Sequence, residues 1–360
     1  MSDRWERARV VSPDYARSGR SRVVQGLFSV ETVNGIRPLR PARDLPDLAD
    51  LIEQAFGSEL SLGGENVLRE LRFLARLGPL SLLLLAMGGP VDGLLNGFVW
   101  EQDGRVVGNV TLSRPTGHAR RWQISNVAVL DAYRGRGIGR SLVETALDAI
   151  VRRGGETAYL YVREDNPAAV HLYESVGFVA VDRLSSLVLP AREPLPGTVT
   201  GRAAELRLLR RLRPGEGQAL YELAVQARGA GQKWLGVPHR RRFVRTWEER
   251  LLERASSLWA AERETFWGVS VTDRRLRAGI SLRASSAWNQ QPHRLEVWVH
   301  PGYRGRLEQA LAQDVMALIA GLAPRRVLVS LPACEEAMAA ALLERSFDRV
   351  RTLILLKLEL

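Results

Sequence analysis

A glycine-rich turn follows an apolar segment in the first half of the chain. Residues 126–130 read Asn-Val-Ala-Val-Leu, and the turn is Arg134-Gly135-Arg136-Gly137-Ile138-Gly139-Arg140. Glycine lets the backbone approach a ligand closely, and the backbone N–H groups at a helix N-terminus point toward an anion. Three arginines add positive charge at the same place. The spacing therefore predicts a phosphate-binding loop, with a pyrophosphate as the expected ligand.

A helix is expected directly behind this loop. Apolar residues recur at helical spacing until Gly154-Gly155 ends the run. The turn lacks the Gly-Lys-Ser/Thr of a P-loop and the glycine spacing of a dinucleotide-binding fold, which argues against both classes. The expected apolar face consists of Ile138, Leu142, Val143, Ala146, Leu147, Ile150 and Val151.

A second motif begins about thirty residues further on. Residues 158–163 (Ala-Tyr-Leu-Tyr-Val-Arg) predict a strand, and residues 166–178 (Asn-Pro-Ala-Ala-Val-His-Leu-Tyr-Glu-Ser-Val-Gly-Phe) predict a short helix and the start of another strand. Asp165 or Asn166 can cap that helix, Pro167 suits its first turn, and Gly177 can end it.

In this order, the two motifs resemble the GNAT superfamily of acyl-CoA-dependent N-acetyltransferases. The greatest similarity is to the ribosomal-protein alanine N-acetyltransferases, which share the Val162-Arg163-x-x-Asn166 lead-in. The resemblance implies an α/β fold with a mixed sheet and helices on both faces. It also implies acetyl-CoA as cosubstrate, and a thioester that is attacked directly by an amine in a ternary complex.

The resemblance also implies residue roles. Tyr173 matches the family's general acid, which protonates the departing thiolate, although its place also suits a core aromatic. Asn166 could be a helix cap only, and Arg140 a solvated helix residue. The implied acetyl-CoA-binding residues are Val127, Ala128 and Val129 on the strand edge, Arg134, Gly135, Arg136, Gly137, Ile138, Gly139 and Arg140 in the loop, and Asn166.

No general base stands out. The alanine N-acetyltransferases place a glutamate on the fifth strand where this chain has Tyr161. The amine proton could leave through water ordered by Ser125, Asn126 or Tyr161, or the amine could arrive already neutral.

The second half of the chain repeats the first at an almost constant offset. Arg304 corresponds to Arg134 at an offset of 170, and Phe347 corresponds to Phe178 at an offset of 169. Such a constant offset indicates a duplicated domain. Its chemistry is lost, because the positions of Gly137, Gly139, Asn166 and Tyr173 are taken by Leu307, Gln309, Glu335 and Leu342.

We therefore expect four segments. They are an N-terminal extension at 1–30, a catalytic GNAT domain at 31–190, a linker at 191–202, and a degenerate GNAT-like domain at 203–360. In the first domain, Gly35–Pro38 is an expected strand, and a hairpin is expected about Asp103-Gly104. The second domain could mimic the partner of a GNAT dimer, so that a monomer or a homodimer is expected.

The composition narrows the range of molecules that this chain is expected to bind. The net charge is +11, and all of the 51 basic residues except Lys233 and Lys357 are arginines. The densest basic run, 239–245, predicts a solvated helix face more readily than a nucleic-acid site.

One cysteine and a charged N-terminus without a signal peptide fit a cytoplasmic protein. The five scattered histidines predict no metal site. The apolar segment Gly78–Trp100 is interrupted by glycines and a proline, so we expect no membrane span, although it could contact a partner.

The sequence thus predicts an N-acetyltransferase that acts on a small-molecule or peptide amine. A protein N-terminal acetyltransferase is the alternative within enzymes, and a non-catalytic acyl-CoA-binding regulatory module is the alternative from another class.

Overall fold

The structure is a computed structural model that describes residues 34–60, 72, 96–115, 118–191, 206–244, 262–270, 275–286 and 291–360. The predicted extension at 1–30 and most of the apolar segment 78–100 lie outside these residues. Among the helices that are described, none is both long and apolar enough to cross a membrane.

The first half (residues 34–191) follows the predicted order of elements. The hairpin turn lies at Asp103 and Gly104, whose φ angles of 53° and 81° are those of a tight hairpin. The elements are β1 (Gly35–Pro38), α1 (Pro41–Leu60), β2 (Gly97–Gln102), β3 (Arg105–Ser113), β4 (Arg121–Val129), η4 (Asp131–Tyr133), α4 (Ile138–Arg152), β5 (Thr157–Arg163), α5 (Pro167–Val176) and β6 (Val179–Leu189).

The second half (residues 206–360) repeats much of this order, with additional short helices before its main hairpin. Its elements are β7 (Arg210–Arg211), η5 (Pro214–Glu216), α6 (Gly217–Gln226), α7 (Ala230–Trp234), α8 (Arg240–Phe243), β8 (Glu262–Ser270), β9 (Leu276–Ser285), β10 (His293–Val299), η6 (Pro301–Tyr303), α10 (Glu308–Ala320), β11 (Val327–Pro332), η7 (Ala333–Glu335), α11 (Glu336–Leu343) and β12 (Asp348–Glu359).

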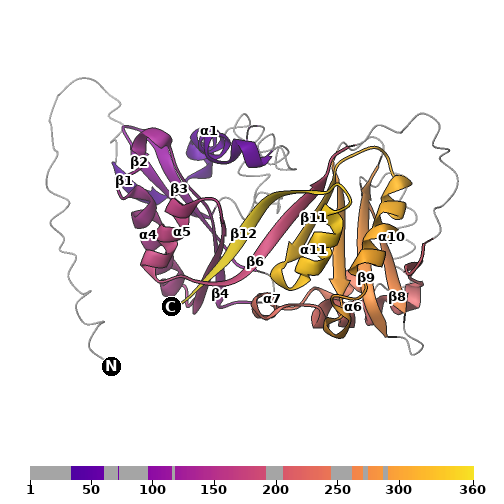
Figure 1. Cartoon of the computed structure of the whole chain (residues 1–360). Coiled ribbons are helices and arrows are strands. Elements are labelled where there is room, and N and C mark those ends of the chain that lie inside the picture. The colour runs from indigo at the N-terminus through magenta and orange to yellow at the C-terminus, as the bar shows by residue number, and fades with distance from the viewer. Residues whose placement is uncertain are drawn as a thin grey trace, which may run out of the picture.

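The described strands form one sheet of twelve, in the order β1-β2-β3-β4-β5-β12-β6-β11-β10-β9-β8-β7. Figure 1 shows the long strands β6 and β12 crossing together from one half to the other. The strand that the sequence predicted after residue 177 is β6, but it does not pair with β5, because β12 from the second half lies between the two. The exchange is reciprocal. Arg163 pairs with Leu353 on β12, and Pro332, the counterpart of Arg163 in the repeat, pairs with Leu184 on β6.

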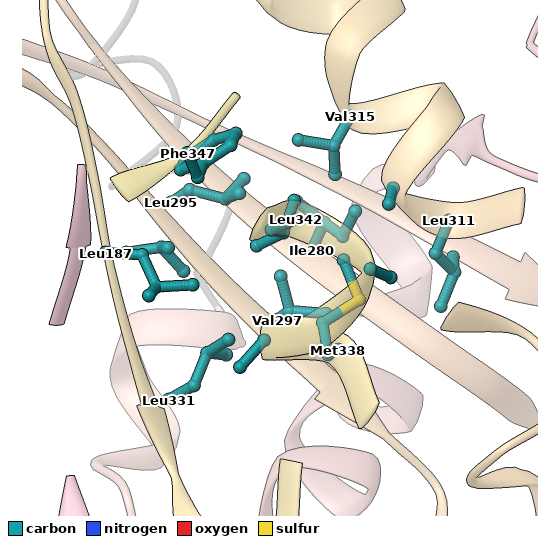
Figure 2. Packing of buried hydrophobic residues seen from close by; sticks show 14 of the residues in the cluster. Leu187, Ile280, Leu295, Val297, Leu311, Val315, Leu331, Met338, Leu342 and Phe347 are labelled. Atoms are coloured by element: carbon teal, nitrogen blue, oxygen red, sulfur yellow. The ribbon is translucent and has the colours of Figure 1, made fainter. Parts of the chain in front are cut away.

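The two cores show the same exchange. Leu187 and Leu189 of β6 are buried in the core of the second half, where Figure 2 shows Leu187 beside Leu295 and Phe347. Conversely, Ile354 and Leu356 of β12 are buried in the core of the first half. Each half therefore buries apolar side chains that the other half contributes.

Helices cover both faces of the sheet in the first half. Val106 packs against α1, whereas the next residue, Val107, packs in the core that contains α4. Because neighbouring residues of a strand point to opposite faces, α1 and α4 lie on opposite sides. One predicted core residue was wrong, since Val151 of α4 is 54% exposed and Ala149 is buried in its place.

An ion-pair network attaches α1 to the edge of the sheet. Buried Arg37 on β1 donates two hydrogen bonds of 2.6 and 2.7 Å to Asp44 of α1 and a third to Glu101 of β2. Burial raises the pKa of Glu101, but the hydrogen bonds from Arg37 and Arg43 outweigh it, so the pKa falls below its usual range.

Candidate active site

A β-bulge on β4 sets the geometry of the site. Thr111 pairs with Ser125 and Asn109 pairs with Ala128, so β4 has one more residue than β3 in this stretch. Asn126 lies in the bulge with a φ of 50°, a conformation that asparagine tolerates better than most residues. The buried Asn109 holds the bulge, because its Nδ2 donates to the carbonyl of Asn126 at 3.0 Å.

The bulge changes which β4 side chains face α4. Trp122 and Ile124 pack in the core beneath α4, as do Val127 and Val129, so the spacing between Ile124 and Val127 is three residues instead of two. Ala128 instead packs against α1. Since an extra residue reverses the alternation of a strand, the bulge reorients the backbone just where the resemblance places the acetyl-CoA-binding strand edge.

Strand β4 also separates from β5. The parallel pairing covers only Arg121–Gln123 of β4 and Thr157–Tyr159 of β5. Beyond this point β4 keeps its ladder to β3, but its other edge pairs with no strand among the described residues. The edge at Val127, Ala128 and Val129 is therefore available to another hydrogen-bonding chain.

The phosphate loop (residues 134–140) connects β4 to α4. Gly135 and Gly137 have φ angles of 75° and 79°, which favour glycine, and no atom lies within 4 Å of the place where either would carry a Cβ. Gly137 caps α4, and within the described part of the chain no side chain accepts a hydrogen bond from the first turn of this helix. The loop therefore presents unsatisfied backbone donors and open space at the positive end of a 15-residue helix.

The three loop arginines lie around this end of α4. Arg134 forms an ion pair of 2.7 Å with Asp131 and donates to the carbonyl of Val129. Arg136 donates to the carbonyl of Ala132 at 2.9 Å. Arg140 donates to the hydroxyl of Ser175 on α5 at 2.5 Å, so it links the two helices in this structure.

Asn166, one of the two caps that the sequence allowed, and Gly177 bound α5. The Oδ1 of Asn166 accepts a hydrogen bond of 3.1 Å from the N–H of Ala169, which gives Asn166 the role of helix cap. Gly177 ends the helix with a φ of 106°. A contact between Asn166 and acetyl-CoA stays a prediction.

Tyr173 lies on the inner face of α5. Its side chain is 6% exposed, and its ring packs edge-on against Phe178 with centroids 5.9 Å apart. Burial raises the pKa of its hydroxyl to about 12. The phenol therefore stays protonated at neutral pH and can donate a hydrogen bond or a proton when negative charge develops nearby.

The expected position of the general base holds two tyrosines. Leu160 and Val162 pack beneath α4, so the side chains of Tyr159 and Tyr161 point to the opposite face of the sheet. The Tyr159 hydroxyl donates to Gln123 at 3.2 Å. Burial raises the pKa of Tyr161, and the neighbouring charge of Asp182 adds to the shift. Asp182, on β6, was not singled out from the sequence, because β6 reaches this place only through the folded sheet.

In the second half, carboxylates of the chain occupy the matching positions. The buried Glu308 accepts hydrogen bonds from the N–H groups of Gly305 (2.8 Å) and Leu307 (3.0 Å), so it satisfies the donors of the counterpart loop (residues 304–310). Glu335 accepts from the N–H of Val299 at 3.4 Å and forms an ion pair of 2.9 Å with Arg304. The backbone N–H groups of the phosphate loop in the first half thus have no side-chain acceptor among the described residues, whereas those of the second half bind carboxylates of the chain itself.

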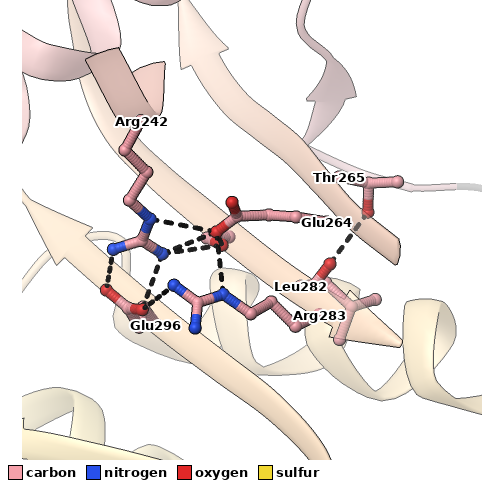
Figure 3. Close-up of polar contacts among 7 residues, drawn as sticks. Arg242, Glu264, Thr265, Leu282, Arg283 and Glu296 are labelled. Atoms are coloured by element: carbon pink, nitrogen blue, oxygen red, sulfur yellow. Dashed lines mark hydrogen bonds and ion pairs between the residues drawn. The ribbon is translucent and has the colours of Figure 1, made fainter. Parts of the chain in front are cut away.

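A further ion-pair network covers β8, β9 and β10. Figure 3 shows Arg242 of α8 between Glu264 and Glu296, with N–O distances of 2.6 Å to each. Arg283 approaches the same two carboxylates at 3.1 and 3.6 Å. Glu296 is the counterpart of Asn126 in the repeat. The position that lies in the β-bulge of the first half therefore carries, in the second half, a carboxylate whose charge is neutralised by two arginines.

This network also revises the interpretation of the basic run at 239–245. Arg242 is 23% exposed and bound to two glutamates, and Arg240 donates to Gln218 at 2.9 Å. Arg245 lies outside the described residues. The run is therefore not a uniformly solvated helix face, because its central arginine helps to hold the second half together.

Known sequences identify the first half. The family model for acetyltransferases of the GNAT family matches residues 91–178, which contain β4, the phosphate loop, α4 and α5. The chain carries a GNAT-family acetyltransferase domain. Curated relatives align with parts of it: the [ribosomal protein bS18]-alanine N-acetyltransferase of Escherichia coli is 47% identical over 53 residues, or 15% of this chain and 36% of the relative. The N-alpha-acetyltransferase RimI of Mycobacterium tuberculosis is 50% identical over 60 residues, or 17% and 36%.

The alignments with the curated relatives are short. A mycothiol acetyltransferase of Renibacterium salmoninarum is 37% identical over 68 residues, or 19% of this chain and 20% of the relative. The chain thus spans between a fifth and about a third of the length of these three relatives.

Solved structures show that the GNAT fold extends over both halves. A GCN5-related N-acetyltransferase of Sphaerobacter thermophilus superposes with a TM-score of 0.58 at 19% identity, covering 90% of this chain and 95% of that one. A tandem GNAT protein from the clavulanic acid biosynthesis pathway superposes with a TM-score of 0.53 at 17% identity, covering 90% and 98%. At these identities the similarity shows the fold, which is a tandem GNAT arrangement.

Proposed function

We propose that this chain is an acetyl-CoA-dependent N-acetyltransferase with a single active site in the first half. The contrast between the two helix N-termini supports this most strongly. The α4 end leaves the amides of the phosphate loop without an acceptor from any described side chain, whereas the Glu308 carboxylate binds the amides of the counterpart loop. A loop that receives an anion from outside needs open donors, and a loop that has its own carboxylate does not.

The residues of the first half fit acetyl-CoA. The amides of residues 135–140 would hold the pyrophosphate, and the free edge of β4 at 127–129 would hydrogen-bond the pantetheine arm as an added strand. The cosubstrate supplies an acetyl thioester, which is activated toward amines. Asn109 and the bulge at Asn126 fix the β4 N–H groups that would orient and polarise the thioester carbonyl.

Acetyl transfer then requires one bond to form and one to break. The amine nitrogen bonds to the carbonyl carbon and loses a proton to water, the carbon–sulfur bond breaks, and Tyr173 gives its hydroxyl proton to the thiolate. A phenol with a pKa near 12 is fully protonated before this step and regains its proton from solvent afterwards. The reaction is a direct transfer in a ternary complex, and we propose the cytoplasm as its location because the cosubstrate is made there.

Protein N-terminal acetylation is the second candidate. The relatives with alanine and N-alpha-acetyltransferase names match at 47% identity over 53 residues and 50% identity over 60 residues. The tyrosine at 161 argues for a different route for the amine proton than a glutamate would give.

Thiol release from acetyl-CoA tests the proposal, with a panel of N-terminal peptides, polyamines, amino acids and aminoglycosides as acceptors. We expect turnover with one class, abolished by Gly137→Glu and strongly reduced by Tyr173→Phe. Gly305→Glu places the same side chain in the counterpart loop, at the equivalent of Gly135, and should retain activity. Acetyl-CoA binding without turnover on any amine would favour a regulatory acyl-CoA-binding module. Full activity in both first-half variants would refute the site.

A further inference from the structure

A segment of the second half covers the α1-side face of the first half's sheet. Trp234, at the end of α7, packs edge-on against Tyr159 with ring centroids 5.5 Å apart. Arg121 and Lys357 each place a positive charge 5.0 Å from the Trp234 ring centre. Arg121 also donates to the carbonyl of Trp234. These contacts fix the junction segment (residues 227–236) against β4, β5 and β12.

Tyr161 lies at the inner end of this junction. It is two residues beyond the last β4–β5 pair, on the part of β5 that has separated from β4. Across the sheet, Tyr161 pairs with Leu355, and Leu355 pairs with Asp182 on β6. Because paired residues of neighbouring strands share a face, Tyr161 and Asp182 lie on the same surface as the junction segment.

The junction segment packs directly on Asp182. A Cβ at Gly231 would lie 2.5 Å from the Cβ of Asp182, so the α7 backbone touches β6. The half-buried Asp182 accepts a hydrogen bond from the N–H of Arg183 at 2.8 Å. Burial raises its pKa, although backbone hydrogen bonds from Arg183 and Ala333 oppose the shift.

Arg228 brings the opposite charge to the same place. Its guanidinium donates to the backbone carbonyls of Gln232 and Gly236, and no carboxylate of the described residues lies within ion-pair distance of it. The carboxylate whose charge acts on the pKa of Arg228 is that of Glu296, and its oxygens are already bound by Arg242 and Arg283. Burial lowers the pKa of Arg228, and the neighbouring Tyr161 opposes that shift. Arg228 is thus a half-buried cation without a direct counter-ion, beside Tyr161.

From this arrangement, and resting on the acetyltransferase function proposed above, we propose that the acceptor site spans both halves and takes amines that carry a carboxylate a few bonds from the nitrogen. Arg228 binds the carboxylate, since a guanidinium matches its two oxygens. Asp182 and Tyr161 face the amine, which is attracted to a carboxylate of opposite charge. The second half therefore selects the acceptor, although it binds no cosubstrate of its own.

Matched acceptor pairs test this in the full-length protein. Each amine is offered as a free carboxylate and as its carboxamide, for example alanine and alaninamide, and kcat/KM is measured for both. In the wild type we expect the carboxylate to be favoured by about tenfold or more, which corresponds to roughly 1.4 kcal/mol. Arg228→Gln should lower the carboxylate value by about that factor and leave the carboxamide value within about twofold. Arg228→Lys should retain part of the preference, and Lys233→Gln, an exposed change on the neighbouring helix, all of it.

Equilibrium binding separates a failure of this inference from a failure of the catalytic proposal. Binding of alanine and alaninamide to the protein saturated with CoA is measured by titration calorimetry, without any need for turnover. Preferential binding of alanine that disappears in Arg228→Gln supports the acceptor site even if no amine is acetylated. Equal binding of the two probes, or a preference that Arg228→Gln leaves intact, overturns it. Absence of acetyl-CoA binding to the wild type would instead refute the proposed function.

Discussion

The tandem repeat provides a matched pair of glycines for testing the phosphate loop. Gly135 and Gly305 occupy equivalent positions in the two halves with φ angles of 75° and 77°, and no atom lies within 4 Å of a Cβ built on either. Alanine at either position would therefore clash with nothing and would only strain the backbone. That strain costs about 1–2 kcal/mol for a residue in the left-handed region, so both variants should lose a similar, small amount of stability.

Ligand binding should distinguish the two variants. Acetyl-CoA at one hundred times its Kd stabilises a single-site protein by about 2.7 kcal/mol. If the methyl group of Gly135→Ala weakens binding tenfold, that gain falls to about 1.4 kcal/mol, whereas Gly305→Ala should retain the full gain. Thermal unfolding with and without acetyl-CoA measures both quantities. An equal loss of ligand stabilisation in the two variants, or a larger loss in Gly305→Ala, would refute the assignment of the binding loop.

Three further outcomes follow from the structure. Tyr173→Phe should lower kcat by about 10²-fold, as expected for loss of a general acid, with little change in Tm because the ring contact with Phe178 remains. In the wild type, kcat should not fall through deprotonation of Tyr173 up to pH 10, since the pKa of its hydroxyl is near 12. Burial raises the pKa of Glu335 to about 7, so the stability linked to its proton is present below about pH 4.5 and is lost as pH rises to 7. When the free energy of unfolding is measured in urea as a function of pH, Glu335→Gln should lack this dependence, which is worth about 3 kcal/mol. The same pH dependence in the two proteins would contradict the prediction. Leu187→Ala should destabilise the chain by about 2–5 kcal/mol in one cooperative transition, because β6 belongs to the core of the other half; two separate transitions would show that the halves unfold independently.

Local patterns predicted the parts of the site that depend on neighbouring residues. The spacing of apolar residues in α4, the cap at Asn166 and the left-handed Gly177 are determined within one or two turns of chain. The repeat, through its nearly constant offset, also located the counterpart loop and its lost glycine at Leu307.

Features that depend on pairing between distant segments were not predicted. The bulge at Asn126 results from the register of β4 against β3, and nothing in the strand's own sequence fixes that register. Glu335 was known as a substitution, but only the structure shows that its carboxylate and that of Glu308 bind backbone N–H groups. Val151 was assigned to the core by periodicity alone, and it is exposed because it lies at the edge of the buried face of α4.

The exchange of β6 and β12 has a consequence for how the chain matures during synthesis. The edge of β5 pairs with residues 353–359, which are translated after every other strand of the described sheet. Until they arrive, the catalytic half exposes the unpaired edges of β5 and β6, which are sites for intermolecular strand pairing. A nascent chain that stops shortly before these residues would have a complete phosphate loop and an incomplete sheet. Quality control of this enzyme therefore depends on β12, because the sheet of the first half cannot be completed before that strand has been translated.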